Sequence, residues 1–195
     1  MVADPINKIW IRPITTRLAK YVNVNPNLIT FAALLVGSYS LYSLYMLDFV
    51  RAGILFLIYE MLDDLDGDVA RTWKRSSKNG KFFDNFVDTL LIPLFPLILG
   101  YSLGYTFIGF LCYIGYVLND YTYYSGNDDQ KPAVNTQSNN TAKTIIISVF
   151  TMGTGFQILL LSLGVIFAPL YSIYIYAFGI NVNWAVRFSR KMIYK

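Results

Sequence analysis

Long apolar stretches are the feature that most constrains how this 195-residue chain can fold. Its mean hydropathy is +0.43, and only 14% of its residues are charged, against about 25% in soluble domains. A helix needs about 20 mostly apolar residues to cross the hydrocarbon core of a bilayer. The chain is therefore predicted to be an all-α integral membrane protein, with a single domain over residues 1–195. Its six predicted transmembrane helices cover residues 28–48, 52–70, 82–100, 104–121, 144–164 and 167–187.

The segment before the first predicted span is basic and amphipathic. Lys8, Arg12, Arg17 and Lys20 alternate there with apolar side chains, and no continuous apolar run typical of a secretory signal peptide is present. A helix of this composition lies in the plane of a membrane, with its apolar side in the head-group region. We therefore expect an amphipathic surface helix over residues 5–22.

The distribution of basic residues predicts the orientation in the membrane. Of the 16 Lys and Arg residues, 15 fall in the N-terminal segment, in the loops 71–81 and 122–143, and in the C-terminal segment 187–195. Only Arg51 lies on the opposite side. The positive-inside rule then places both termini and both long loops in the cytoplasm, in a protein of the cell membrane. The net charge of +4 follows from this topology and from contact with anionic lipids, so no nucleic-acid partner is predicted.

Aspartates gather at the end of the second predicted span. Asp63 and Asp66 are three residues apart, and Gly67, Ala70 and Arg71 continue the same face of a helix. Carboxylates inside a membrane are costly unless a partner compensates their charge. This face is therefore predicted to be part of a functional site.

The third predicted span begins with a second face of this kind, formed by Gly80, Asp84 and Asp88 at intervals of four residues. A short loop joins the two spans, so four aspartates are expected to converge at the cytoplasmic edge of the bundle. Such a group would be strongly repulsive without bound cations. Three further acidic residues point off these faces and are expected to be solvated: Glu60, Asp64 and Asp68.

The chemistry of this group predicts a hard divalent cation. The chain has no His and a single Cys, and carboxylate oxygens favour Mg²⁺ or Mn²⁺ over Zn²⁺. Mg²⁺ usually completes its shell with water and substrate phosphate, so a phosphorylated substrate is implied. The glycines leave the backbone open to a flat ring or a phosphate, and Arg71 is suited to a phosphate oxygen.

Together these residues form a pattern that resembles the signature of the CDP-alcohol phosphotransferase family at every fixed position: Asp63-x2-Asp66-Gly67-x2-Ala70-Arg71-x8-Gly80-x3-Asp84-x3-Asp88. The resemblance extends to Pro26-Asn27-x-x-Thr30 at the start of the first span, to the six-helix plan and to the N-terminal surface helix. It becomes weak beyond residue 105. The family usually forms homodimers, so a homodimer is expected.

The resemblance implies a role for each matching position. Two divalent cations, Mg²⁺ or Mn²⁺, would be held by Asp63, Asp66 and Asp84, with Asp88 completing the second metal site and acting as the general base. The residues implied to contact the cytidine and the diphosphate are Gly67, Ala70, Arg71 and Gly80, assisted by Asn27 and Thr30. The implied reaction moves a phosphatidyl-type group from a CDP-lipid to a polar alcohol and releases CMP.

The acceptor alcohol is not determined by this pattern. A second branch of the family uses CDP-choline or CDP-ethanolamine with a lipid alcohol, and this branch stays open as an alternative. Lys143, Arg187 and Arg190 are candidate contacts for an acceptor phosphate, or simply positive-inside anchors. The fourth predicted span contains no Lys or Arg, which argues against a phosphorylated acceptor.

A cation or proton transporter is an alternative from another functional class, because acidic residues inside a helical bundle often mark an ion path. Transporters usually bind their ions near the middle of the bilayer, at broken helices or between internal repeats. Here the carboxylates are predicted to lie at one edge, beside a basic loop. The spacing therefore favours the transferase.

Overall fold

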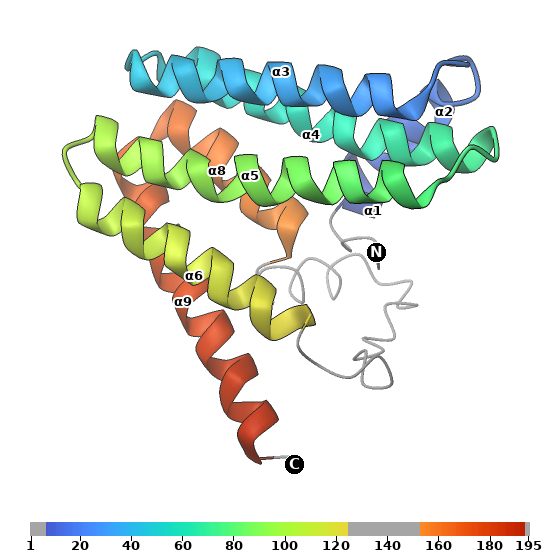
Figure 1. Cartoon of the computed structure of the whole chain (residues 1–195). Helices are drawn as coiled ribbons and strands as arrows, with labels where there is room; N and C mark the ends of the chain where they lie inside the picture. The colour runs from blue at the N-terminus through green and yellow to red at the C-terminus, as the bar shows by residue number, and fades with distance from the viewer. Residues whose placement is uncertain (1–6, 125–152, 194–195) are drawn as a thin grey trace.

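The computed structural model describes residues 7–124 and 153–193, and within these ranges all regular secondary structure is helical, as predicted (Figure 1). Two short helices come first and six longer ones follow. In chain order they are α1 (Asn7–Trp10), α2 (Arg12–Leu18), α3 (Pro26–Tyr45), α4 (Phe49–Thr72), α5 (Lys78–Ser102), α6 (Thr106–Tyr124), α8 (Thr154–Phe167) and α9 (Pro169–Ile193).

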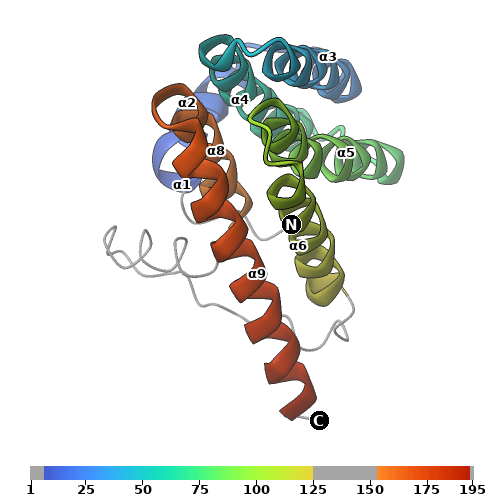
Figure 2. The ribbon, with the colours of Figure 1, turned by 90° about the vertical axis from the view of Figure 1, so that its left-hand side faces the viewer.

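The longer helices within these ranges pack as a ring. α3 lies against both α4 and α5; α4 continues to α8, α8 to α9, α9 to α6, and α6 closes the ring on α5. Figure 2 views the bundle from one end of α3, α4 and α5 and shows these three helices grouped together. α4 and α5 meet mainly through long side chains, such as the stacked rings of Phe56 and Phe95, whose centroids are 4.0 Å apart. Side chains can therefore project between the two helices.

Local capping fixes where α3 and α5 begin. The Asn25 side chain accepts a hydrogen bond from the backbone N–H of Asn27, and Pro26 occupies the first turn of α3, where its missing N–H is harmless. The Ser77 hydroxyl likewise accepts from the N–H of Gly80 at the start of α5. The starts of α3 and α5 lie at the same end of the bundle as the last turn of α4 (Figure 1).

Four of the predicted spans match helices to within a few residues: α3, α4, α5 and α6. α9 matches the sixth, with its end extended to Ile193. The fifth, predicted over 144–164, is only partly described, because residues 144–152 lie outside the described ranges. α4 runs to Thr72 and α5 starts at Lys78, so the loop predicted over 71–81 is shorter than expected.

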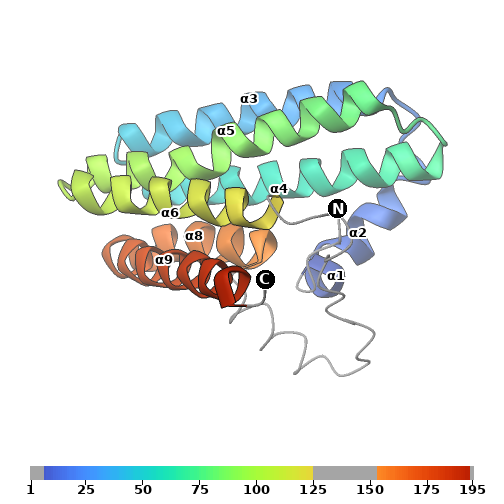
Figure 3. The same ribbon diagram turned by 60° about the horizontal axis from the view of Figure 1, so that its bottom comes forward.

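The N-terminal segment differs from the single surface helix predicted over 5–22. From residue 7 onward it forms the short helices α1 and α2, which are separated at Ile11, and α2 ends at Leu18. Pro13 in the first turn of α2 explains the break, because a proline ring clashes with the carbonyl four residues earlier. α2 packs on the last turns of α4, where Ala19, Ile29 and Val69 form a small buried cluster. Figure 3 shows α1 and α2 beside this end of α4.

Among the described residues, the helices α3 and α5 are long and apolar enough to cross a membrane, and α8 is apolar but shorter. α4 does not meet the same criterion, because the helix that would cross the bilayer also carries the acidic motif. The number of membrane spans therefore stays a prediction.

Candidate functional site

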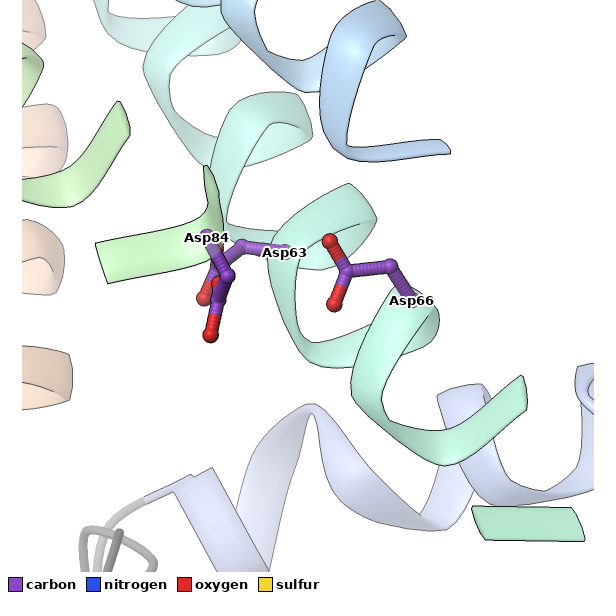
Figure 4. Close-up of side chains that lie close together, drawn as sticks. All are labelled: Asp63, Asp66 and Asp84. Carbon is purple, nitrogen blue, oxygen red and sulfur yellow. The ribbon is translucent and has the colours of Figure 1, made fainter. Parts of the chain in front are cut away.

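Three of the four predicted metal ligands converge between α4 and α5. Asp63 and Asp66 come from the last turns of α4, and Asp84 comes from the second turn of α5. One carboxylate oxygen from each lies within 4.8 Å of the other two. Figure 4 shows Asp63 and Asp84 side by side, with Asp66 one turn away on the same helix as Asp63. The grouping expected from the sequence is therefore present for these three residues.

The donor atoms of this group fit a hard divalent cation. All three ligands are carboxylates, which Mg²⁺ and Mn²⁺ prefer. Asp63 Oδ1 is buried and has no hydrogen-bond partner among the described residues, whereas buried polar atoms are nearly always paired. A cation would satisfy this oxygen and remove the repulsion among the carboxylates.

Asp66 is held in place by a hydrogen bond from α3. The Thr30 hydroxyl donates a hydrogen bond to Asp66 Oδ2 at 2.5 Å, and both side chains are buried. Because Thr30 lies in the second turn of α3, the geometry of the three-carboxylate group depends on three helices and not on two. Thr30 was predicted to assist nucleotide binding; in the structure its hydroxyl contacts a predicted metal ligand.

The fourth predicted ligand, Asp88, lies one turn farther along α5 and does not belong to the three-carboxylate group. Its Oδ1 accepts a hydrogen bond from the hydroxyl of Tyr59 at 2.5 Å. Tyr59 is fully buried, and it was not among the site residues predicted from the sequence. It precedes Asp63 by four residues, so its position on the same face of α4 was readable from the spacing.

The predicted nucleotide residues lie at the same end of the bundle. A Cβ added to Gly80 would come within 2.9 Å of Asn27 Oδ1 and 3.0 Å of Ser77 Oγ, so the starts of α3 and α5 are in close contact there. Beside this contact is an open pocket lined by Asn25, Pro26, Asn27, Arg75 and Ser77. The Arg75 guanidinium donates a hydrogen bond to the carbonyl of Val24, which ties the α4–α5 loop to the segment before α3.

Gly67 and Arg71 also lie together. The Arg71 guanidinium folds back along α4, and a Cβ on Gly67 would meet Arg71 Nη1 and Nη2 at 3.2 and 3.3 Å. Ala70 is half-buried in the same turn. The absence of a side chain at Gly67 therefore leaves the space that the guanidinium occupies.

The acidic residues predicted to be solvated are not solvated in the structure. Glu60 and Asp68 are buried, and Asp64 is half-buried with an oxygen 4.0 Å from Arg12 Nε. Asp68 accepts hydrogen bonds from Thr15 at 2.7 Å and from Thr16 at 3.1 Å, because α2 covers this side of α4. The prediction was wrong because helical spacing identifies the face of α4 but not the element packed against it.

The candidate acceptor contacts come from two parts of the chain. Lys143 lies outside the described residues. Arg187 and Arg190 lie in the last turns of α9, which packs on α6 and α8 and extends away from α4 (Figures 1 and 2).

Comparison with known proteins defines the class of this protein. The sequence matches the profile of the CDP-alcohol phosphatidyltransferase family over residues 23–179, which is most of the chain. The protein belongs to this family, which confirms the resemblance noted from the motif. It also confirms the enzyme class, a transferase of substituted phosphate groups in a family of membrane-associated enzymes.

The chain resembles several curated proteins over some of its length. It is 37% identical to a bifunctional IPC transferase and DIPP synthase of Archaeoglobus fulgidus over 90 residues, which cover 45% of this chain and 18% of that protein. It is 35% identical to a CDP-diacylglycerol-serine O-phosphatidyltransferase of Helicobacter pylori over 83 residues, or 42% and 35% of the two chains. It is 33% identical to an archaetidylinositol phosphate synthase of Pyrococcus horikoshii over 69 residues, or 35% and 37%. The matched segments span less than half of each of these relatives.

We expect Asp63→Asn, Asp66→Asn and Asp84→Asn each to weaken Mn²⁺ binding to the purified protein, because each removes an anionic ligand. The loss should be at least about tenfold, the lower bound seen when even an outer-shell partner of a metal ligand is removed. Titration followed by the electron paramagnetic resonance signal of free Mn²⁺ measures it.

The matched control for these variants is Asp48→Asn. Asp48 caps the start of α4 at the other end of the helix, where its side chain accepts from the N–H of Arg51. Mn²⁺ affinity equal to the control in all three site variants would show that these carboxylates do not form the metal site.

Proposed function

We propose that this protein is an integral membrane enzyme that transfers a phosphatidyl-type group from a CDP-linked lipid to a polar alcohol and releases CMP. The observation that carries the proposal is the convergence of Asp63, Asp66 and Asp84 oxygens within 4.8 Å of one another, in a chain of the CDP-alcohol phosphatidyltransferase family. Oxygen ligands of this kind serve Mg²⁺-dependent or Mn²⁺-dependent chemistry on phosphates.

Two divalent cations would be held by the three grouped aspartates, with Asp88 completing the second site. Bound there, they would neutralise the donor diphosphate and polarise its β-phosphorus. Asn27, Gly67, Ala70 and Gly80 would contact the cytidine and the phosphates, and Arg71 would bind a phosphate oxygen. The pocket beside Asn27 supports this placement of the nucleotide.

Asp88 would act as the general base. It takes the proton of the acceptor hydroxyl as the acceptor oxygen bonds to the β-phosphorus of the donor. The bond from that phosphorus to the bridging oxygen breaks, and CMP leaves with the electron pair. The hydrogen bond from Tyr59 supports this role, because it fixes the orientation of the Asp88 carboxylate through Oδ1 and does not involve Oδ2. No covalent enzyme intermediate is needed.

The membrane arrangement belongs to the same proposal. Six spans would place the acidic group and both termini on the cytoplasmic side of the cell membrane, with α2 on the membrane surface. The basic α4–α5 loop, with Lys74 and Arg75, supports this orientation. We further propose that the protein acts as a homodimer, as is usual in the family.

A CDP-lipid donor is favoured over CDP-choline or CDP-ethanolamine. The name of the Helicobacter pylori relative gives CDP-diacylglycerol as its donor, and that of the Pyrococcus horikoshii relative describes an inositol phosphate product. Both names describe a lipid joined to a polar alcohol, which supports the same division of substrates here.

The proposal is tested by incubating the purified protein with Mg²⁺, CDP-diacylglycerol or CDP-archaeol, and a panel of polar alcohols that includes serine, inositol phosphate and glycerol phosphate. CMP release that requires both the metal and one alcohol, with a lipid product of the matching mass, is the expected result. Product only from CDP-choline and diacylglycerol would select the other branch of the family. Ion flux in vesicles without CMP release would select a transporter.

Replacement of Asp88 separates binding from chemistry. We expect Asp88→Asn to leave the affinity for the CDP-linked donor largely intact and to lower kcat by about 10²- to 10⁴-fold, the usual contribution of a general base. Isothermal titration with CDP, which serves as the probe of the donor site, measures the affinity, and the CMP-release assay measures kcat. Full activity in this variant would exclude Asp88 as the base.

Single-cysteine labelling tests the orientation. Cys112 is the only cysteine and is buried, so Cys112→Ala gives a background without reactive thiols. On this background a membrane-impermeant maleimide should label Ser76→Cys in inside-out vesicles and Met46→Cys in intact cells, because the two loops lie at opposite ends of α4. Labelling of Ser76→Cys from outside the cell would reverse the proposed topology.

A further inference from the structure

Asp68 occupies one of the two variable positions between Gly67 and Ala70 in the motif, so the family resemblance assigns it no role. In the structure it is nevertheless one of the most extensively bonded side chains at this end of the bundle. Its side chain is only 8% exposed. Oδ2 accepts hydrogen bonds from Thr15 and Thr16 of α2, and Oδ1 accepts from Arg71 Nη2 at 2.7 Å. One buried carboxylate therefore joins α2 to the arginine of the motif.

We propose that Asp68 is a positioning residue, which holds the Arg71 guanidinium in place for the diphosphate of the donor. This inference rests on the proposed function. Arg71 has a side chain that is 56% exposed, and an exposed arginine without an anchor samples many rotamers. The ion pair with Asp68 fixes one edge of the guanidinium, and the bare backbone of Gly67 gives it room to lie along α4. The remaining N–H groups of the fork can then bind phosphate.

The hydrogen bonds from Thr15 and Thr16 allow the Asp68 carboxylate to stay buried. A carboxylate that is buried without enough donors is unfavourable and tends to turn toward water. Thr15 is itself 1% exposed, and its hydroxyl lies 2.7 Å from Asp68 Oδ2. These bonds satisfy one oxygen of Asp68 and leave the other for Arg71. The docking of α2 is thereby linked to the orientation of a residue in the proposed donor site.

Other contacts between the N-terminal segment and α4 do not involve Arg71. The Trp73 indole N–H donates to the carbonyl of Ala19 at 3.0 Å, and Arg12 lies 4.0 Å from Asp64. These contacts allow the docking of α2 to be weakened without touching the Asp68–Arg71 pair. They provide the control that separates positioning of Arg71 from general loss of structure.

The test is a double-mutant cycle on the binding of CDP in the presence of Mg²⁺, measured by isothermal titration of the full-length protein. We expect Asp68→Ala to weaken CDP binding by about tenfold, the scale of one hydrogen bond between charged groups. In the Arg71→Ala background the same change should have less than about a twofold effect, because Asp68 acts through Arg71. In the CMP-release assay, Asp68→Ala should raise the KM for CDP-diacylglycerol and leave kcat nearly unchanged.

Three further variants make the outcome decisive. Asp68→Asn should restore some of the affinity, because the amide oxygen can still accept from Arg71. Thr15→Val keeps the shape of threonine and should weaken CDP binding less than Asp68→Ala does, and Trp73→Phe should leave it unchanged. Thermal unfolding in detergent shows whether each variant is folded. Should Asp68→Ala be unfolded, the positioning role is decided by comparing the CDP affinities of Asp68→Asn and Thr15→Val with that of Trp73→Phe.

The possible failures are distinct. The positioning role would be overturned if Asp68→Ala weakened CDP binding equally with Arg71 present and in the Arg71→Ala background, or if Trp73→Phe weakened it as much as Asp68→Ala does. In both cases the wild-type protein would still release CMP. A wild-type protein that neither binds CDP nor releases CMP would overturn the proposed function, and this inference with it.

Discussion

The repulsion among three carboxylates is the constraint on which this end of the molecule depends. Asp63, Asp66 and Asp84 have oxygens within 4.8 Å of one another, an arrangement that folds stably only with counter-charge or with firm support from the scaffold. The support comes from α3, whose Thr30 hydroxyl holds Asp66, and from the buried packing of α4 and α5 around Phe56 and Phe95. A rigid group of this kind is preorganised for a cation, because its ligands do not have to be gathered when the ion arrives.

Three helices contribute to this group in different ways. α4 supplies two of the three carboxylates and α5 supplies the third. α3 packs on both helices and orients the Asp66 carboxylate. The first turns of α3 and α5 are set by the caps Asn25 and Ser77, which also line the pocket beside the starts of these two helices. Capping therefore has two effects here: it fixes the helix starts, and it places polar groups where a nucleotide would be bound.

The sequence predicted the helical class, the approximate bounds of most helices and the convergence of three aspartates, since these follow from apolar length and from the spacing of residues on one helix face. It did not predict the burial of Asp68 and Glu60 or the contact of Tyr59 with Asp88, because these depend on which element covers each face. The break between α1 and α2 was readable from Pro13 but was not expected. The number of spans cannot be derived from apolar length alone, because the charged motif lowers the hydropathy of α4.

The docking of α2 against the last turns of α4 has a consequence for where a reaction could take place. In the proposed membrane arrangement, α2 would rest on the membrane surface. Because α2 is bonded to α4 through Asp68, it would then set the depth of the carboxylates relative to the head groups. A lipid substrate could then keep its chains among its neighbours while only its phosphates entered the protein, and a polar co-substrate could arrive from water. The N-terminal segment would thus match the level of the ligands to that of the lipid phosphates.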